Sequence, residues 1–341
     1  MKTEKENPQE DSARTLGEHA IIELMRNFFE PMPDVAVPFG DDVSAVPVAH
    51  LKSEVAVLKT DMLVATTDIP VSMGMWEAAR KAVVMNVSDF AAKGVQPRAI
   101  LVSLGLPRSL KREDIVDLAK GLNAGAREYG AYIVGGDTGE ASDLIIAVCV
   151  YGAAVKDSLM LRSGAKPGDI LAVTGLFGRS AAGLRLLLDN KCRASNALRK
   201  ALVDSTCMPE ARLREGLELQ HLGAVTSSID SSDGLAWCLH ELAAQSGVGF
   251  KVSKVPVADD VKEFAKLNGY DPLELTLYGG EEYELVLTVN PKEWQAAQAA
   301  VNAVGGKLLR IGEATVDRQI VLEVSGVKQE IQARGYEHFK G

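Results

Sequence analysis

The spacing of apolar residues predicts strands and helices that alternate along most of the chain. Residues 74–93 have apolar side chains at helical spacing, with Trp76, Val83 and Phe90 on one stripe and Gly94 as the stop. The predicted helices are 17–29, 74–93, 111–129, 179–189, two within 196–219, 233–245 and 291–303. The predicted strands are 43–48, 55–59, 99–106, 131–134, 144–151, 170–173, 224–229, 249–252, 307–311 and 320–324.

This alternation predicts an α/β (α+β) fold with two domains. A chain of 341 residues is long enough for roughly two domains, and the polar stretch 155–167 separates two alternating halves. We therefore expect a disordered tail over 1–15, an N-terminal domain over 16–156 and a C-terminal α/β domain over 157–341.

Composition narrows the function classes. Apolar residues make up 47% and charged residues 24% of the chain, which is typical of a soluble globular protein. The net charge of −9 argues against nucleic acid as a partner. The longest apolar run, 144–155, is too short to span a membrane, the first residues lack a signal-peptide pattern, and four dispersed cysteines suit a reducing compartment. We expect a cytoplasmic protein.

Familiar catalytic motifs are missing. The sequence has no GxxxxGK[ST], no GxSxG, no HExxH, and no GxGxxG between a strand and a helix. Residues 175–178 (GLFG) are a partial match: they could seat a phosphate on a helix N-terminus, although a plain strand-to-helix turn fits them better.

Aspartates beside Gly, Ser or Thr recur instead, at expected junctions between elements. Converging carboxylates repel one another unless a cation screens them, and hard oxygen ligands favour Mg²⁺ or Mn²⁺, which in turn favours a nucleotide polyphosphate. A lone Asp, such as Asp233, can equally be a turn former or helix N-cap. Asn86 and Asp89 lie one turn apart in an otherwise apolar helix, where a metal or its water shell would satisfy them. The junctions are 40–42, 60–61, 67–68, 88–89, 135–138, 230–234 and 279–284.

Read in order, these segments resemble the thiamine-monophosphate kinase family, in its archaeal form, within the aminoimidazole ribonucleotide synthetase-like superfamily. The matching segments are GDDVSAV (40–46), KTDM (59–62), RKAVVMNVSDFAAKGVQP (80–97), GGDT (135–138), RSGAKPGD (162–169), TGLFGRSAAGLRLL (174–187), IDSSDGL (229–235), GGEEYEL (279–285) and GYEHF (335–339).

The resemblance implies direct, in-line transfer of the γ-phosphate of ATP to thiamine monophosphate, assisted by several Mg²⁺ ions. It also implies a homodimer in which two N-terminal mixed sheets, carrying the ATP and Mg²⁺ sites, pair into a barrel. The implied metal ligands are Asp42, Thr60, Asp61, Asp89, Asp137, Asp230 and Asp233, of which Asp61, Asp89 and Asp137 are expected to be catalytic. The implied ATP contacts are Gly136, Asp137, Arg162 and Ser232. The implied thiamine monophosphate contacts are Asp68, Glu281 and an aromatic residue, Phe339 or Tyr336.

Departures from the family pattern, among them one at Lys59, and several alternative functions stay open. Many relatives have Thr-Thr-Asp where this chain has Lys59-Thr60-Asp61. The same carboxylates would also serve aminoimidazole ribonucleotide synthetase or another ATP-dependent enzyme of the superfamily, a metal-dependent phosphatase, or a non-catalytic nucleotide-binding protein.

Overall fold

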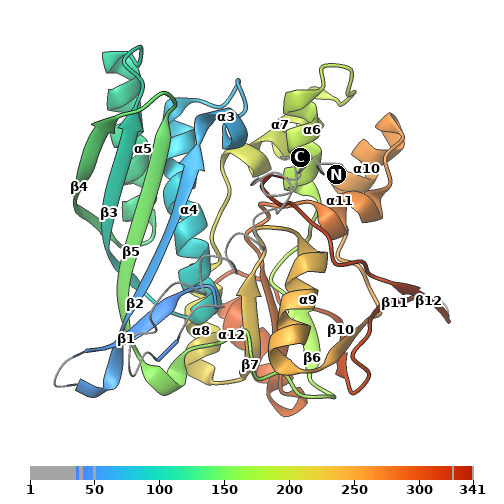
Figure 1. Cartoon of the computed structure of the whole chain (residues 1–341). Helices are drawn as coiled ribbons and strands as arrows, with labels where there is room; N and C mark the ends of the chain where they lie inside the picture. Colours follow the sequence, from blue (N-terminus) through green and yellow to red (C-terminus); the bar gives the residue numbers. More distant parts are fainter. Residues whose placement is uncertain (1–35, 38–40, 49–50, 325, 340–341) are drawn as a thin grey trace, which may run out of the picture.

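The computed structural model describes residues 36–37, 41–48, 51–324 and 326–339. These residues form two separate mixed sheets with helices packed around them (Figure 1). The expected tail over 1–15 and helix over 17–29 lie outside the described residues. None of the described helices has the length and apolar character that a bilayer crossing requires.

The first sheet has five strands in the order β1-β2-β5-β3-β4, antiparallel except for the β3–β4 pair. Helices α4 and α5 pack against it, and the short helix α3 follows β2 (Figure 1). The strands are β1 (Ser44–Val48), β2 (Leu51–Val64), β3 (Pro97–Leu106), β4 (Tyr132–Glu140) and β5 (Ile145–Val155). The helices are α3 (Ala65–Asp68), α4 (Met75–Lys93), α5 (Arg112–Glu128) and the 3-10 turn η1 (Lys156–Ser158).

The opposite face of this sheet carries apolar side chains that no described element covers. Strand residues alternate between faces, so Val55, Val57 and Leu63 of β2 are buried under the helices while Leu58 and Met62 point the other way. The register aligns Leu58 with Tyr151 of β5. Met62 is 61% exposed, so we call this surface the open face.

The second sheet has seven strands in the order β12-β11-β8-β10-β6-β9-β7. Its adjacent strands β6 and β9 are mainly apolar and every residue in them is buried, as in sheets that are covered on both faces. The strands are β6 (Ile170–Val173), β7 (Val225–Asp230), β8 (Gly249–Val252), β9 (Leu285–Val289), β10 (Leu309–Thr315), β11 (Ile320–Val324) and β12 (Val327–Glu330). The helices are α6 (Arg179–Leu188), α7 (Asn196–Cys207), α8 (Leu213–Leu222), α9 (Leu235–Ser246), α10 (Asp259–Asn268), α11 (Pro272–Tyr278), α12 (Trp294–Ala303) and the turn η2 (Pro291–Glu293).

Helix α4 lies between the two halves and is buried on nearly every side. It contacts α5, β2 and β5 in the first half, and α8 and β7 in the second (Figure 1). Helices α5 and α8 pack so closely against α4 that each has a glycine at the contact. A Cβ atom on Gly121 of α5 would lie 2.1 Å from the carbonyl oxygen of Trp76, which a real side chain could not tolerate. A Cβ atom on Gly216 of α8 would likewise lie 2.1 Å from the carbonyl oxygen of Ala91. Polar side chains on α4 are therefore held at the boundary between the halves.

Two expected strands are too short, and this changes the placement of two motifs. Strand β2 continues to Val64 and β4 continues to Glu140, so Thr60-Asp61 and Gly136-Asp137 lie within strands rather than in loops after them. Pairing with β5 and β3 continues through these residues, which outweighs the weak strand propensity of Gly and Asp.

Candidate functional site

Three buried carboxylates from distant parts of the chain meet at the boundary between the halves. Asp42 lies just before β1, Asp89 lies in the last turns of α4, and Asp230 ends β7. Each offers an oxygen that is within 4.8 Å of the others, and each side chain is almost fully buried. Ser88 donates to Asp230 Oδ2 at 2.6 Å, which fixes this carboxylate against α4.

Asp61 joins this group from β2. Its backbone nitrogen donates to Asn86 Oδ1 at 2.8 Å, and Asn86 Nδ2 donates to the carbonyl oxygen of Ala82. The polar residue in the apolar helix is thus satisfied by the neighbouring strand and by its own helix. The hypothesis that Asn86 needs a metal or its water shell is unnecessary, whereas Asp89 does face other carboxylates.

Lys59 places its ammonium group among these acids. Its Nζ lies 3.1 Å from Asp61 Oδ1 and 3.0 Å from Asp89 Oδ2. Burial disfavours the charged amine, but the carboxylates of Asp89 and Asp61 outweigh that effect and raise the pKa of Lys59 above its ordinary value. The side chain therefore stays a cation.

Lys93 and Arg162 hold the other end of the group. Lys93 Nζ lies 2.9 Å from Asp41 Oδ1 and 2.7 Å from Asp42 Oδ2, and it donates to the carbonyl oxygen of Ser228 at 2.7 Å. Arg162 Nε donates to Asp42 Oδ1 at 2.6 Å, and its Nη1 contacts Glu241 at 3.3 Å. Both carboxylate oxygens of Asp42 are thus paired with cations.

The pKa values of the three buried carboxylates differ because their partners differ. Burial opposes ionisation of Asp42, but Lys93 and Arg162 outweigh it and keep the pKa of Asp42 below its ordinary value. Burial raises the pKa of Asp89 well above its ordinary value, and the charges of Asp230, Asp61 and Asp42 add to this against the effect of Lys59. Burial and then Asp42 raise the pKa of Asp230 to about 7.

The donors in this group fit a divalent cation such as Mg²⁺. Six carboxyls surround three basic side chains, so the site is short of positive charge. The shortage of positive charge is greatest at Asp89 and Asp230. The pKa values of both carboxyl groups are raised, which shows that their ionised forms are disfavoured in this environment. Hard carboxylate oxygens with no sulfur or imidazole in the group favour Mg²⁺ or Mn²⁺ over zinc.

Beside the carboxylates, two loops and the C-terminal segment are joined by backbone hydrogen bonds. The Ser232 carbonyl accepts from Glu281 N at 2.6 Å, and the Asp233 carbonyl accepts from Tyr336 N at 3.0 Å. Glu281 and Tyr283 have φ values of 62° and 53°, a left-handed conformation that non-glycine residues rarely adopt. Ser232, Asp233, Glu281 and Tyr336, which the family resemblance implicates, are thus brought together.

Two local interpretations of this region are decided by the structure. Lys81 of α4 forms an ion pair with Glu281 at 2.6 Å, so Glu281 has a cationic partner from the first half. Helix α9 begins after Gly234 with no side-chain cap, so Asp233 is not a helix N-cap. At the start of α6, Glu282 Oε1 accepts from Gly178 N at 2.6 Å and from Ser180, so a carboxylate occupies the helix N-terminus where the sequence left room for a phosphate.

Other implicated residues lie apart from the buried carboxylates. Asp137 is aligned across the sheet with Ser103, Ala147 and Met62, and because Met62 points to the open face, Asp137 does too. Side chains alternate along β2, so Thr60 lies on the same face as Met62 and on the opposite face from Asp61. Gly136 precedes Asp137 in the exposed strand β4. Asp68 in α3 accepts from Val64 N at 2.7 Å, and Phe339 is exposed near the C-terminus.

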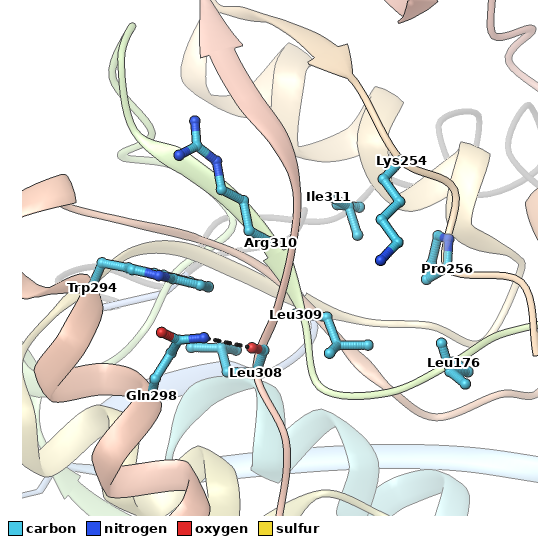
Figure 2. Close-up of a pocket in the computed structure, with 9 residues that line it drawn as sticks. All are labelled: Leu176, Lys254, Pro256, Trp294, Gln298, Leu308, Leu309, Arg310 and Ile311. Carbon is cyan, nitrogen blue, oxygen red and sulfur yellow. Dashed lines mark hydrogen bonds between the residues drawn. The ribbon is translucent and has the colours of Figure 1, made fainter. Parts of the chain in front are cut away.

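A separate pocket of about 350 Å³ lies on the second half, and none of the implied metal, ATP or thiamine monophosphate contacts lines it, although Leu176 of the 175–178 segment does. Figure 2 shows Trp294 and Gln298 of α12 on one side, with Gln298 Nε2 bonded to the carbonyl oxygen of Leu308 at 3.2 Å. Lys254 and Arg310 supply its positive charge. It is therefore distinct in position and in sign from the acidic site.

The sequence analysis did not identify the ion pairs of the site. Lys93 and Glu241 were not singled out, and Lys59 and Asp41, which stood out as a departure from the family pattern and as part of the 40–42 junction, were given no ion-pair partner. The signal available was a lysine inside an apolar strand or helix, since a buried ammonium group requires acidic partners. Their pairing joins residues up to 135 positions apart, which one sequence does not reveal.

Comparison with known proteins identifies the family. The family model for the N-terminal domain of AIR synthase related protein matches residues 40–154 of this chain. The model for the C-terminal domain of the same family matches residues 166–325. Thiamine-monophosphate kinase of Nitrosopumilus maritimus is 36% identical over 295 residues, covering 86% of this chain and 92% of that protein. The Pyrococcus horikoshii thiamine-monophosphate kinase is 37% identical, with 94% and 96% covered. This chain belongs to the thiamine-monophosphate kinase family.

A solved structure supports the same assignment for the fold. AaThiL complexed with AMPPCP and TMP superimposes with a TM-score of 0.82 at 28% identity, covering 95% of this chain and 97% of that chain. The family resemblance and the two-domain α/β fold expected from the sequence are thereby confirmed. The expected pairing of the N-terminal sheets from two copies of the chain into a barrel stays a prediction.

Proposed function

We propose that the protein transfers the γ-phosphoryl group of ATP to thiamine monophosphate, giving ADP and thiamine diphosphate. The observation that carries this proposal is the group of three buried carboxylates, Asp42, Asp89 and Asp230, within 4.8 Å of one another in a chain of this family. The relative complexed with AMPPCP, an ATP analogue, and TMP supports both substrates.

Electrostatics explains why such a site suits this reaction. Both substrates are anions, and two like charges about 4 Å apart cost about 4 kcal/mol at an effective dielectric near 20. When bound, Mg²⁺ supplies positive charge between the phosphates and the carboxylates. The acceptor is a phosphate oxygen that is already ionised near neutral pH, so the protein needs no strong general base.

The roles of individual residues follow from the family resemblance and from position. Asp42, Asp61, Asp89 and Asp230 would hold Mg²⁺, with Asp233, Thr60 and Asp137 as further ligands. Arg162, Ser232 and Gly136 would contact ATP. Asp68 and Glu281 would face the thiazolium cation of thiamine monophosphate, and Phe339 or Tyr336 would stack on its rings.

We further propose a homodimer formed through the open face, with residues 16–156 as the ATP, Mg²⁺ and dimerisation domain and 157–341 as the C-terminal domain. The exposed apolar side chains of Leu58, Met62, Leu101 and Tyr151 support this pairing, because a monomer rarely leaves so broad an apolar sheet face in water. Thr60 and Asp137 would then lie next to the second copy.

The direct experiment incubates the protein with MgATP and thiamine monophosphate and separates the products by chromatography. We expect ADP and thiamine diphosphate in equal amounts. Asp→Asn substitution at Asp61, Asp89 or Asp137 should abolish turnover while the circular dichroism spectrum is unchanged. Phosphate release that needs no acceptor would indicate a phosphatase instead, and Mg²⁺-dependent ATP binding without turnover would indicate a non-catalytic nucleotide-binding protein.

A further inference from the structure

The ammonium group of Lys59 has different partners from that of Lys93, the other buried lysine of the site. Lys93 is fully buried and contacts three acceptors, Asp41, Asp42 and the Ser228 carbonyl, which engages all three of its N–H bonds. Lys59 retains some exposure and joins two carboxylates, Asp61 Oδ1 and Asp89 Oδ2, at 3.1 and 3.0 Å. The ammonium group of Lys59 thus lies between a strand carboxylate and a helix carboxylate.

This position is one that a divalent cation would otherwise take. Two carboxylates held at the same distance from one point repel each other until a positive charge stands between them. A metal ion does this at about 2.1 Å from each oxygen, and an ammonium group does it at about 2.7 to 3.2 Å. Lys59 supplies the charge without dissociating, since it is covalently part of β2.

Asp89 also belongs to a second cluster, which is the candidate place for a metal. Asp89, Asp42 and Asp230 each offer an oxygen within 4.8 Å of the others, whereas the ion pairs of Lys59 are with Asp61 and Asp89. The Ser88 hydroxyl donates to the Asp230 carboxylate, but this neutral group does not compensate the negative charge of the carboxylate. Lys59 therefore compensates one part of the site and leaves another part to the metal.

We propose that Lys59 is a positioning residue that acts as a built-in cation between Asp61 and Asp89, so that this protein binds one divalent ion fewer per chain than the same protein with a neutral residue at position 59. The proposal rests on the proposed function only in taking the carboxylate group to be a metal site. It concerns the number of ions and is independent of which acceptor receives the phosphoryl group.

The first test counts bound Mn²⁺ by equilibrium dialysis on the full chain. Lys59→Thr and Lys59→Gln should each bind one more Mn²⁺ per chain than the wild type, and Lys59→Arg should match the wild type because it keeps the charge. Lys251→Met is the control, since Lys251 pairs with Glu313 on the surface and should leave the count unchanged. Equal counts in the folded neutral variants and the wild type would overturn the proposal.

A second measurement uses only the wild type and so does not depend on the folding of any variant. Crystals of the protein loaded with Mn²⁺ should give an anomalous peak beside Asp89 and Asp230, and none bridging Asp61 and Asp89, where Lys59 Nζ should remain. A Mn²⁺ peak between Asp61 and Asp89 would refute the idea. Product formation is measured separately, so a protein that binds metal as expected but makes no thiamine diphosphate would count against the proposed function alone.

Discussion

Replacing Asp230 by Asn should stabilise the metal-free protein at alkaline pH while removing a proposed metal ligand. Asp230 is 5% exposed, and its pKa rises from 3.8 to about 7 on folding. A carboxyl group whose pKa is raised in the folded state stabilises the fold most below pH 3.8, and this contribution is lost as the pH rises through 7. At roughly 1.36 kcal/mol per pH unit, the total loss is about 4 kcal/mol.

The substitution is close to isosteric, so the charge effect can be isolated. In Asp230→Asn the new amide oxygen can still accept the Ser88 hydroxyl, and the amide nitrogen can donate to the carboxylates of Asp42 or Asp89, the other members of the buried group. With a chelator present, the free energy of unfolding of Asp230→Asn minus that of the wild type should therefore increase by about 2 to 3 kcal/mol between about pH 5 and pH 8.

Urea unfolding of both proteins at several pH values measures this gap, with Asp259→Asn as a control because Asp259 is exposed on α10. Adding saturating Mg²⁺ should then stabilise the wild type and leave Asp230→Asn almost unchanged, because only a state that binds the ion gains stability from it. A gap that stays constant with pH, or a variant that is less stable than the wild type at about pH 8, would refute the electrostatic reasoning.

Two further predictions concern other parts of the molecule. Met62→Glu or Leu101→Glu on the open face should shift the protein toward monomer in sedimentation velocity runs, because each places a charge where the second copy is proposed to pack; an unchanged dimer would argue for another interface. Glu282→Gln should gain stability relative to the wild type as the pH rises from 4.5 to 7, by ~3 kcal/mol at most, because burial raises the pKa of Glu282 to about 7; parallel urea midpoints across this range would contradict it.

The long regular elements were predictable from the sequence because their apolar spacing is a local property. The helix expected over 74–93 is observed as Met75–Lys93, and the strand expected over 170–173 is observed there. No helix or strand was predicted between residues 253 and 290, although helix α10 has Val261, Phe264 and Ala265 at helical spacing and β9 is apolar except for Thr288. Both signals are local, so these two elements were within reach of the sequence.

The site was only partly predictable, and the reason is physical. Asp89 stands out because a carboxyl group inside an apolar helix needs a partner, and that partner proved to be other buried residues. The spacing of Asp residues along the chain does not say which face of a strand each will occupy. Asp61 and Asp137 both follow apolar runs, yet Asp61 lies under the helices and Asp137 belongs to the open face, because alternation and register decide this only once the strands are paired.

The cations of the site explain how it can exist before any metal binds. Lys93 joins Asp41 and Asp42, which precede the first sheet, to the Ser228 carbonyl in the second sheet, and Arg162 joins Asp42 to Glu241 of α9. Removing one partner of a buried ion pair leaves an uncompensated charge that costs about 3 to 5 kcal/mol, so these pairs hold the two halves in register. The carboxylates of Asp89 and Asp230 carry the remaining negative charge. Because the lysine and arginine ion pairs already assemble the site, the binding free energy of a metal cation is not needed for assembly. It can therefore offset the repulsion between the two anionic substrates.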